Sequence, residues 1–258
     1  MNKMKFEKKI ALVTGSGRGI GKAIAKHFAS LGADLVINYV HNQDSAEACA
    51  QDIRNKGRKA LVVRANIGKP DGIDKLFNEI ISYYGRLDFF IANAASGFNR
   101  PAMQQKMSGW DHTINVNARS FLFAAQQVVP LIEKSGGGKI VAVTSPGADR
   151  VLPDYVAVGA SKAALNALVR YLAVELAIFN ITVNGIAPGI VETDALKHFS
   201  IMQQDDVIKK AIKNTPAGRL VTPQDVAEAV EFLCSRSADM ITGQIITIDG
   251  GYTLPVPK

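Results

Sequence analysis

The stretch of sequence that decides the fold lies near the N-terminus and reads Ala11-Leu-Val-Thr-Gly-Ser-Gly-Arg-Gly-Ile-Gly21. A short apolar run leads into closely spaced glycines, and a helical pattern of apolar residues follows them. Glycines at such a junction let the backbone approach phosphate oxygens, which then lie at the helix N-terminus. A bare glycine pattern is also typical of an ordinary tight turn. Its place between a buried strand and a helix favours a dinucleotide site.

Outward from this stretch, short apolar runs rich in β-branched residues recur between helical patterns. They predict seven strands, at residues 10–14, 35–39, 60–64, 89–93, 140–144, 181–186 and 245–248. The stretches between them, such as 19–31, 45–57 and 71–84, place apolar residues at three- and four-residue spacing. This alternation predicts a single α/β domain over residues 1–258, a Rossmann-type doubly wound parallel sheet with helices on both faces. Residues 192–219 break the rhythm, and we expect them to form a small, mobile helical cover over the substrate site.

Composition restricts the class of protein. Of the 258 residues 47% are apolar, and the longest uncharged apolar runs fall well short of the ~20 residues that span a bilayer. No run of signal-peptide type follows the N-terminal lysines, so we expect a soluble, cytoplasmic protein. Cys49 and Cys234 lack the spacing of metal ligands, which favours reduced packing residues and no metal. The net charge of +7 is scattered, so we expect neither nucleic acid nor a membrane as a partner.

The glycine loop carries a resemblance to a known family. Its spacing, Thr14-Gly15-x-x-x-Gly19-x-Gly21, is that of the short-chain dehydrogenases/reductases, and the chain resembles this family along most of its length. The loop residues for which the resemblance implies cofactor binding are Gly15, Ser16, Arg18, Gly19, Ile20 and Gly21. Further cofactor contacts are implied after three later strands, at Asn66, Ile67, Asn93, Ala94, Pro188, Gly189, Ile190 and Thr193. The match is imperfect after Asn93-Ala94, where the family usually has glycine, and at Asn66, where an aspartate is common.

The end of the second predicted strand, Ile37-Asn38-Tyr39, bears on the choice between NAD and NADP. NAD-specific relatives usually hold the ribose 2′-hydroxyl with an acidic residue there, and a neutral Asn38 removes a repulsion against a 2′-phosphate. Arg18 resembles the basic residue that NADP-dependent members direct at this phosphate, which a guanidinium binds bidentately. We therefore predict NADPH as the cofactor. The alternative is that Arg18 is a solvated surface arginine, and no second arginine follows Tyr39.

Reduction by hydride transfer leaves negative charge on an oxygen, which a proton donor must stabilise. In most members of the family the donor is the tyrosine of Tyr-x-x-x-Lys, with a serine thirteen residues before it. The lysine cation lowers the pKa of this tyrosine from ~10. Here Val158 lies four residues before Lys162, and Ser145 lies thirteen residues before Val158. The nearby tyrosine is Tyr155, which makes Tyr-x6-Lys, the spacing of enoyl-acyl-carrier-protein reductases in a divergent branch of the family.

The shifted tyrosine has a chemical rationale. Seven helical residues separate two side chains on one face by about 10 Å, so Tyr155 is moved outward. In ketone reduction the charged oxygen is on the carbon that receives hydride, whereas in enoyl thioester reduction it is two carbons further away. The resemblance also implies that Lys162 binds the nicotinamide ribose and that Asn115 supports this lysine through a water. A surface Tyr155, a solvated Lys162 and a structural helix bond at Asn115 stay open as alternatives.

Further segments sharpen the resemblance, namely 93–97 with Arg100-Pro101, 193–199 and 214–219. With Tyr155-x6-Lys162 they are similar to the NADPH-dependent type III bacterial enoyl-acyl-carrier-protein reductases. The implied substrate is a trans-2-enoyl thioester on acyl carrier protein, reduced in fatty-acid elongation. The basic residues that would attract this acidic carrier are Lys197, His198, Lys209, Lys210 and Lys213, for which a solvated helical face is the equal alternative. The apolar residues that would line an acyl pocket, or serve equally as packing, are Phe98, Leu152, Phe199 and Met202.

Two other functions stay open at this stage. A carbonyl reductase, such as a 3-oxoacyl-acyl-carrier-protein reductase, shares the fold and cofactor but normally carries tyrosine where Val158 stands. A non-catalytic dinucleotide-binding protein would keep the glycine loop without needing Tyr155 and Lys162. Members of the family commonly form tetramers through the helices after the fourth and fifth strands. We therefore expect a homotetramer that forms through residues 108–132 and 155–177.

Overall fold

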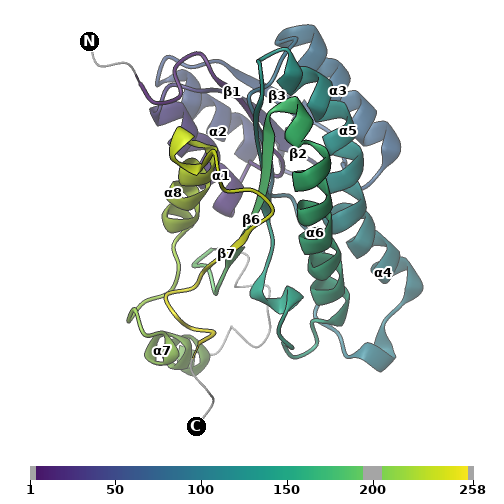
Figure 1. Cartoon of the computed structure of the whole chain (residues 1–258). Coiled ribbons are helices and arrows are strands. Elements are labelled where there is room, and N and C mark those ends of the chain that lie inside the picture. The colour runs from purple at the N-terminus through teal and green to yellow at the C-terminus, as the bar shows by residue number, and fades with distance from the viewer. Residues whose placement is uncertain (1–3, 194–204, 255–258) are drawn as a thin grey trace.

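The chain folds around one parallel sheet, seen in a computed structural model that describes residues 4–193 and 205–254. The order of the strands is β3-β2-β1-β4-β5-β6-β7. Their bounds are β1 Ile10–Val13, β2 Asp34–Tyr39, β3 Ala60–Arg64, β4 Phe89–Ala92, β5 Gly138–Val143, β6 Ile181–Pro188 and β7 Ile245–Ile248. Helices cover both faces of the sheet (Figure 1). The predicted doubly wound fold is confirmed, since every predicted strand coincides with an observed one.

The helices form one layer on each face of the sheet (Figure 1). One layer contains α1 (Gly19–Ser30), α2 (Gln43–Arg54) and α8 (Pro223–Cys234), and the other contains α3 (Pro70–Tyr83), α4 (Met107–Ile114), α5 (Ser120–Glu133) and α6 (Val156–Glu175). Alternate residues of β1 face opposite layers, with Ala11 and Val13 in the core under the first and Leu12 in the core under the second. None of the helices in the described part of the chain is long and apolar enough to cross a membrane.

The strand order reverses next to β1, which pairs with β2 on one side and β4 on the other. Open α/β sheets bind ligands beyond the carboxyl ends of their strands at such a switch point. Helix α7 (Asp205–Asn214) stands apart from the sheet in Figure 1 and is a helix within the described part of the predicted cover at 192–219. Residues 194–204 of that cover lie outside the described residues.

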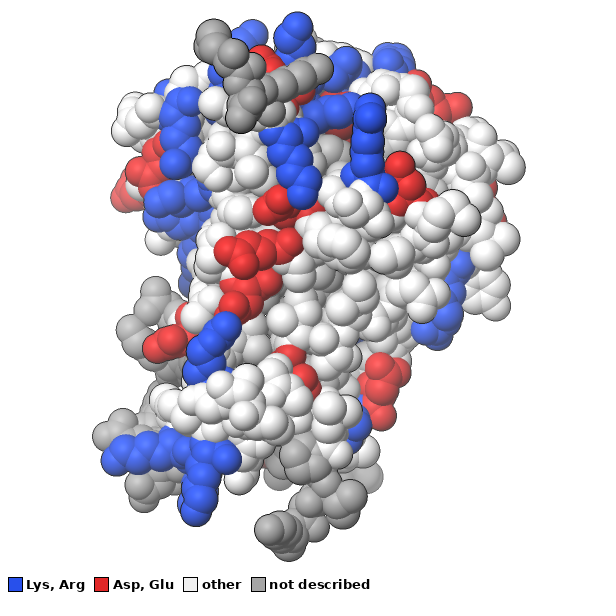
Figure 2. Space-filling view, turned by 60° about the vertical axis from the view of Figure 1, so that its left-hand side comes forward, with Lys and Arg blue, Asp and Glu red and all other residues white. Residues whose placement is uncertain are grey.

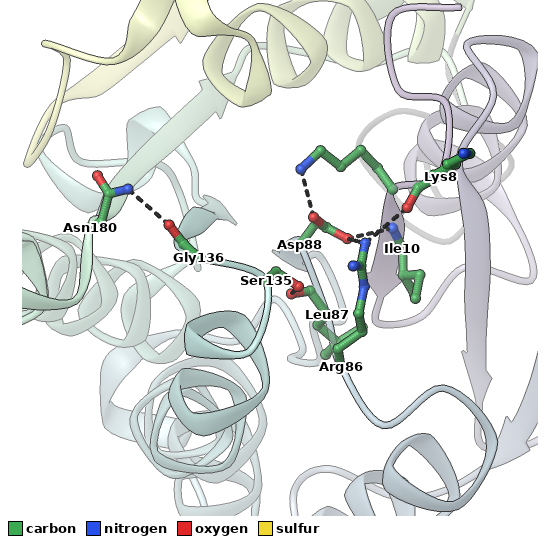
Figure 3. Close-up of polar contacts among 9 residues, drawn as sticks. Lys8, Ile10, Arg86, Leu87, Asp88, Ser135, Gly136 and Asn180 are labelled. Atoms are coloured by element: carbon green, nitrogen blue, oxygen red, sulfur yellow. Dashed lines mark hydrogen bonds and ion pairs between the residues drawn. The ribbon is translucent and has the colours of Figure 1, made fainter.

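A buried carboxylate joins β1 and β4 at the opposite, amino end of the sheet. Asp88 is 1% exposed, and its carboxylate pairs with the ammonium of Lys9 at 2.7 Å and the guanidinium of Arg86 at 3.1 Å. It also accepts a hydrogen bond from the backbone N–H of Ile10 at 3.0 Å. Figure 3 shows these contacts converging on Asp88. Because both of its oxygens have partners, this buried charge is fully compensated.

Candidate active site

The loop between β1 and α1 is braced by residues that follow β4. Thr14 Oγ1 accepts hydrogen bonds from the backbone N–H groups of Asn93 and Ala94, both at 3.0 Å. The side chain of Asn93 donates to the carbonyl of Thr14 at 2.8 Å. Asn93 and Ala94 therefore lie beside the glycine loop, as expected for a cofactor site, and Asn93 has a structural task there.

The glycines of this loop are needed for conformation and for space. Gly15 and Gly19 have φ angles of +64° and +53°, and a Cβ at Gly21 would lie 2.5 Å from Asn93 Nδ2. The loop's backbone leads directly into the first turn of α1, and the N–H groups at a helix N-terminus are able to bind phosphate oxygens. Of the other predicted contacts, Ser16 is fully buried and Ile20 is half-buried. The loop fits the phosphates of a dinucleotide.

Asn38 corrects one detail of the sequence analysis. It is 1% exposed, and its side chain accepts from the N–H of Gly15 at 3.3 Å and donates to the carbonyl of Ala65 at 3.0 Å. Its amide therefore joins the glycine loop to the end of β3, and we expected it beside the 2′-position of the cofactor ribose. The prediction failed because successive side chains of a strand point to opposite faces. At the end of β2 the side chain of Asn38 points into the protein, and Tyr39 is the residue after it. Arg18 is exposed directly before α1, and its contact with a 2′-phosphate stays a prediction.

The remaining predicted cofactor residues lie at the ends of β3 and β6. Asn66 accepts from the N–H of Gly68 at 3.0 Å, in the turn that contains the buried Ile67. Thr193 comes close to the glycine loop, because a Cβ at Gly19 would lie 3.8 Å from its methyl group. Thr193 follows the other predicted residues of this group, Pro188 at the end of β6, Gly189 and Ile190. The fold thus brings both groups to the carboxyl end of the sheet.

Tyr155 lies directly before α6 and points toward Ser145 on the loop after β5. Its hydroxyl donates to Ser145 Oγ at 3.4 Å, and the same oxygen accepts from the N–H of Gly147 at 3.1 Å. Lys162 is 5% exposed, and its ammonium donates to the carbonyl of Val143 at 2.8 Å. Three of the four predicted catalytic residues therefore gather beyond the end of β5.

The protonation of this cluster differs from the sequence prediction. Burial raises the pKa of Tyr155, and the hydrogen bond with Ser145 lowers it only in part. Burial also lowers the pKa of Lys162 to about 8. The prediction that Lys162 lowers the pKa of the tyrosine is wrong for this state of the protein. The reason is that desolvation dominates both groups, whose hydrogen bonds go to Ser145 and to the carbonyl of Val143.

Val158 occupies the position of the family's usual tyrosine and faces the loop after β4. It is 8% exposed, and a Cβ at Gly97 would lie 2.3 Å from its Cγ2. The side chain is therefore packed against a glycine that leaves room for it. The wall of the site at this point is aliphatic and offers no proton.

A π-helical turn spans Asn115–Arg119 between α4 and α5, and the support of Lys162 by Asn115 through a water stays a prediction. Asn115 is half-buried, whereas Asn117 is 3% exposed and donates to the carbonyl of Ser96 at 2.8 Å and to Ser161 Oγ at 2.9 Å. Ser161 precedes Lys162 in α6, and Ser96 lies in the loop after β4. Asn117 is therefore the asparagine that joins this loop to α6 beside Lys162. Sequence reasoning missed it because a π-turn shifts which side chains face inward, and such turns are frequent at functional sites.

Comparisons with known proteins agree with this geometry. A family model described as "Enoyl-(Acyl carrier protein) reductase" matches residues 15–253. The 1-cyclohexenylcarbonyl-CoA reductase of Streptomyces collinus is 34% identical over 97% of this chain and 89% of the relative. The 7α-hydroxysteroid dehydrogenase of Escherichia coli (strain K12) is 38% identical over 96% of this chain and 95% of the relative. The chain belongs to the short-chain dehydrogenase/reductase family. It is therefore an oxidoreductase of that family.

Solved structures of short-chain dehydrogenases/reductases share the whole fold. A 7α-hydroxysteroid dehydrogenase complexed with NADH and 7-oxo glycochenodeoxycholic acid superposes with a TM-score of 0.91 at 37% identity, covering 97% of each chain. An angucycline C-6 ketoreductase with bound NADP superposes with a TM-score of 0.89 at 30% identity, covering 97% of this chain and 98% of that one. These two relatives hold nicotinamide dinucleotides, one NADH and the other NADP.

The surface around this short-chain reductase site is partly apolar and partly basic. Phe98 is 65% exposed and Leu152 is 40% exposed beside the loops that carry Gly97 and Tyr155. Lys209, Lys210 and Lys213 are exposed on α7, and Figure 2 shows basic side chains at the lower end of the molecule. The other residues predicted for the pocket and for the carrier surface are Lys197, His198, Phe199 and Met202, which lie outside the described residues.

Proposed function

We propose that this short-chain reductase uses NADPH to reduce the trans-2 double bond of an enoyl thioester, with Tyr155 as the proton donor. The observation that carries the proposal is that Val158 stands at the position of the family's usual tyrosine, while Tyr155 lies three residues before it. An aliphatic side chain is buried at the usual donor position, and the hydroxyl of Tyr155 lies at Ser145 instead. A displaced donor suits a substrate whose charge appears away from the carbon that is reduced.

In this proposed reduction each residue of the site has a separate role. When bound, the reduced nicotinamide supplies a hydride to the β-carbon of the substrate. The hydroxyl of Tyr155 donates to the thioester oxygen, where the negative charge appears. Burial raises the pKa of Tyr155, which keeps the phenol protonated and able to donate at neutral pH. Ser145 orients that hydroxyl. A proton from solvent then adds at the α-carbon and the thioester oxygen returns the phenol proton to Tyr155, so the substrate gains one hydride and one proton in total.

Features of the chain and of one relative support the details of this proposal. The relative from Streptomyces collinus is named for a CoA thioester in which a ring double bond adjoins the carbonyl. The NADPH preference rests on the exposed Arg18, since a guanidinium suits a 2′-phosphate. We propose an acidic acyl carrier protein as the carrier of the substrate because α7 exposes three lysines that would attract it, namely Lys209, Lys210 and Lys213.

Carbonyl reduction is the second candidate, and the names of two relatives favour it. The hydroxysteroid dehydrogenase is complexed with a 7-oxo steroid, and the angucycline enzyme is a ketoreductase. Tyr155 and Ser145 form a hydrogen-bonded pair of hydroxyls, which is also able to stabilise the oxygen of a ketone. This candidate requires the ketone oxygen to reach Tyr155 rather than the place beside Val158.

A substrate comparison tests both candidates. Purified protein is offered a 2-enoyl thioester or the 3-oxoacyl thioester of the same chain length, with NADPH and NADH in parallel, and nucleotide oxidation is followed by absorbance. We expect turnover of the enoyl substrate with NADPH. Turnover of only the oxo substrate would establish the second candidate. Binding of the nucleotide without turnover of either thioester would contradict both.

A homotetramer is the assembly that we propose. The outward faces of α5 and α6 expose apolar side chains, with Phe123 45%, Tyr171 69% and Val174 78% exposed, and Ile178 in the 3₁₀ turn after α6 is 83% exposed. Exposed apolar patches of this kind mark contact surfaces between chains. Sedimentation velocity at micromolar concentration is expected to give the mass of four chains, and a monomer would contradict the proposal.

A further inference from the structure

The ring of Tyr155 packs against Gly147, whose backbone conformation does not require a glycine. Gly147 lies in the short 3₁₀ turn Pro146–Ala148 and is not among the glycines with positive φ. An alanine is therefore compatible with its backbone. A Cβ there would lie 2.6 Å and 2.8 Å from the Cε1 and Cδ1 atoms of Tyr155, and 3.0 Å from a methyl group of Leu152. Contacts this short do not occur, so the ring would have to move.

The same turn also fixes the hydroxyl end of the ring. The N–H of Gly147 donates to Ser145 Oγ at 3.1 Å, and that oxygen accepts from the hydroxyl of Tyr155 at 3.4 Å. Gly159, one turn into α6, closes the other side of the turn, because a Cβ there would lie 2.8 Å from the carbonyl oxygen of Gly147. The turn is thus held between Ser145 and α6, and it has little room to yield to a displaced ring.

The backbone that leads into Tyr155 is held as well. Asp154 has a left-handed φ of +57°, which is uncommon for a residue other than glycine. Its carbonyl accepts a hydrogen bond from the N–H of Arg100 at 2.7 Å. Since the chain enters at a fixed angle, the space above Gly147 decides where the ring of Tyr155 lies.

We propose that Gly147 is a positioning residue, whose missing side chain places the hydroxyl of Tyr155 beside Ser145 at the reaction centre. This inference rests on the proposed role of Tyr155 as the proton donor. The bond between Tyr155 and Ser145 is already 3.4 Å long, so a small shift of the ring breaks it. A misplacement of about 1 Å in a catalytic group lowers turnover by about 10²-fold.

The first test is a double-mutant cycle of Gly147→Ala with Tyr155→Phe. We expect Gly147→Ala to lower kcat by about 10- to 100-fold while the KM for NADPH stays within about twofold. In the Tyr155→Phe background the same change is expected to cost less than about twofold, because the hydroxyl that it misplaces is absent. The matched control is Gly109→Ala, since a Cβ there meets nothing within 4 Å and Gly109 is not among the positive-φ glycines. It should leave kcat unchanged.

The second test needs no substrate. The phenol ionisation of Tyr155 is followed by absorbance at alkaline pH as the difference between each protein and its Tyr155→Phe counterpart. Burial raises the pKa of this phenol, so a ring pushed out of its seat should titrate at lower pH in Gly147→Ala than in the wild type. A Gly109→Ala protein should titrate as the wild type does.

The outcomes separate this inference from the proposed function. Equal losses of kcat for Gly147→Ala in both backgrounds, or an unchanged phenol titration, would overturn the positioning role even if enoyl reduction is established. Undiminished turnover by Tyr155→Phe would overturn the donor assignment by itself, and with it the positioning role. If only an oxo substrate is reduced, the proposed reaction is wrong, and the cycle measured on that substrate still decides the role of Gly147.

Discussion

The two ends of the sheet treat buried polar groups in opposite ways. At the amino end, the carboxylate of Asp88 is held by Lys9, Arg86 and a backbone N–H, so its charge is compensated from several sides (Figure 3). At the carboxyl end, Lys162 donates to a single backbone carbonyl, and the hydroxyl of Tyr155 makes one long bond. The carboxylate of Asp88 has partners that offset the cost of its burial, whereas Tyr155 and Lys162, to which we assign the chemistry in our proposal, are buried with few partners at a cost in stability.

The largest effect expected from this contrast between the two ends of the sheet is the effect of Tyr155→Phe on turnover. Tyr155→Phe should lower kcat by about 10²- to 10⁴-fold, the usual contribution of a general acid. Thermal stability should change little, because the hydroxyl makes one bond of 3.4 Å. Steady-state kinetics and thermal unfolding, measured on the same preparations, check both statements. A large fall in melting temperature would mean that Tyr155 serves the fold, as Asp88 does.

The opposite pattern is expected at the amino end. Asp88→Asn should lower the free energy of unfolding by about 1–3 kcal/mol, since a neutral amide replaces the buried carboxylate that accepts from Lys9, Arg86 and the N–H of Ile10. Per folded molecule, kcat should stay within about twofold, because the change is remote from the site. Urea unfolding and kinetics provide the measurements.

The exposed pair of Lys139 and Asp239 is the control for this substitution. Its ammonium and carboxylate are 2.6 Å apart, but Asp239 is 58% exposed. Asp239→Asn should cost less than about 1 kcal/mol, because solvent screens exposed pairs. Equal costs for the two substitutions would remove the distinction between a buried and an exposed ion pair in this chain.

Lys162 should show the cost of an unpaired buried charge. Its pKa is lowered from 10.5 to about 8, which corresponds to roughly 3 kcal/mol of destabilisation at neutral pH, where the folded and unfolded chains are both protonated. Lys162→Met removes this penalty but leaves the carbonyl of Val143 without its donor, at a cost of about 1–3 kcal/mol. We expect the variant to be inactive and, without cofactor, more stable than the wild type by about 1 kcal/mol at pH 7.

The pH dependence of this difference is the more specific test. Above about pH 8 the folded wild type releases the Lys162 proton, while the unfolded chain keeps it up to about pH 10.5. The wild type therefore gains stability relative to Lys162→Met as pH rises through this range. Urea unfolding at pH 7 and at pH 9.5 measures the change. A constant difference between the two proteins would show that the charge of Lys162 is not penalised in the folded state.

The remaining expected effect concerns cofactor choice. Arg18→Ala should raise the KM for NADPH by about 10-fold, as expected for the loss of a charge-assisted bond to phosphate, and leave the KM for NADH within about twofold. Asn38→Asp adds an acid at the position where we expected discrimination, but the side chain is buried against the glycine loop. The substitution Asn38→Asp should therefore weaken the binding of both NADPH and NADH. Selective loss of NADPH with Asn38→Asp would contradict the supporting role of Asn38.

Local features of the chain were predictable from sequence because local physics determines them. Every strand was placed to within two residues, since near-continuous apolar runs are specific to strands buried on both faces. The glycine loop was recognised because left-handed φ angles and close backbone contacts tolerate little else. The replacement of the usual tyrosine by Val158 was visible as spacing alone, and the structure adds that this valine is buried.

The sequence by itself determined the fold class, the family and the displaced tyrosine. Only the tertiary structure decided that Asn38 braces the glycine loop, that Asn117 bonds to Ser161 beside Lys162, and that the pKa of Tyr155 is raised. Each of these depends on partners from segments 10 to 44 residues away. Periodicity and propensity are properties of neighbouring residues, whereas burial and hydrogen-bond partners exist only after packing has brought distant segments together.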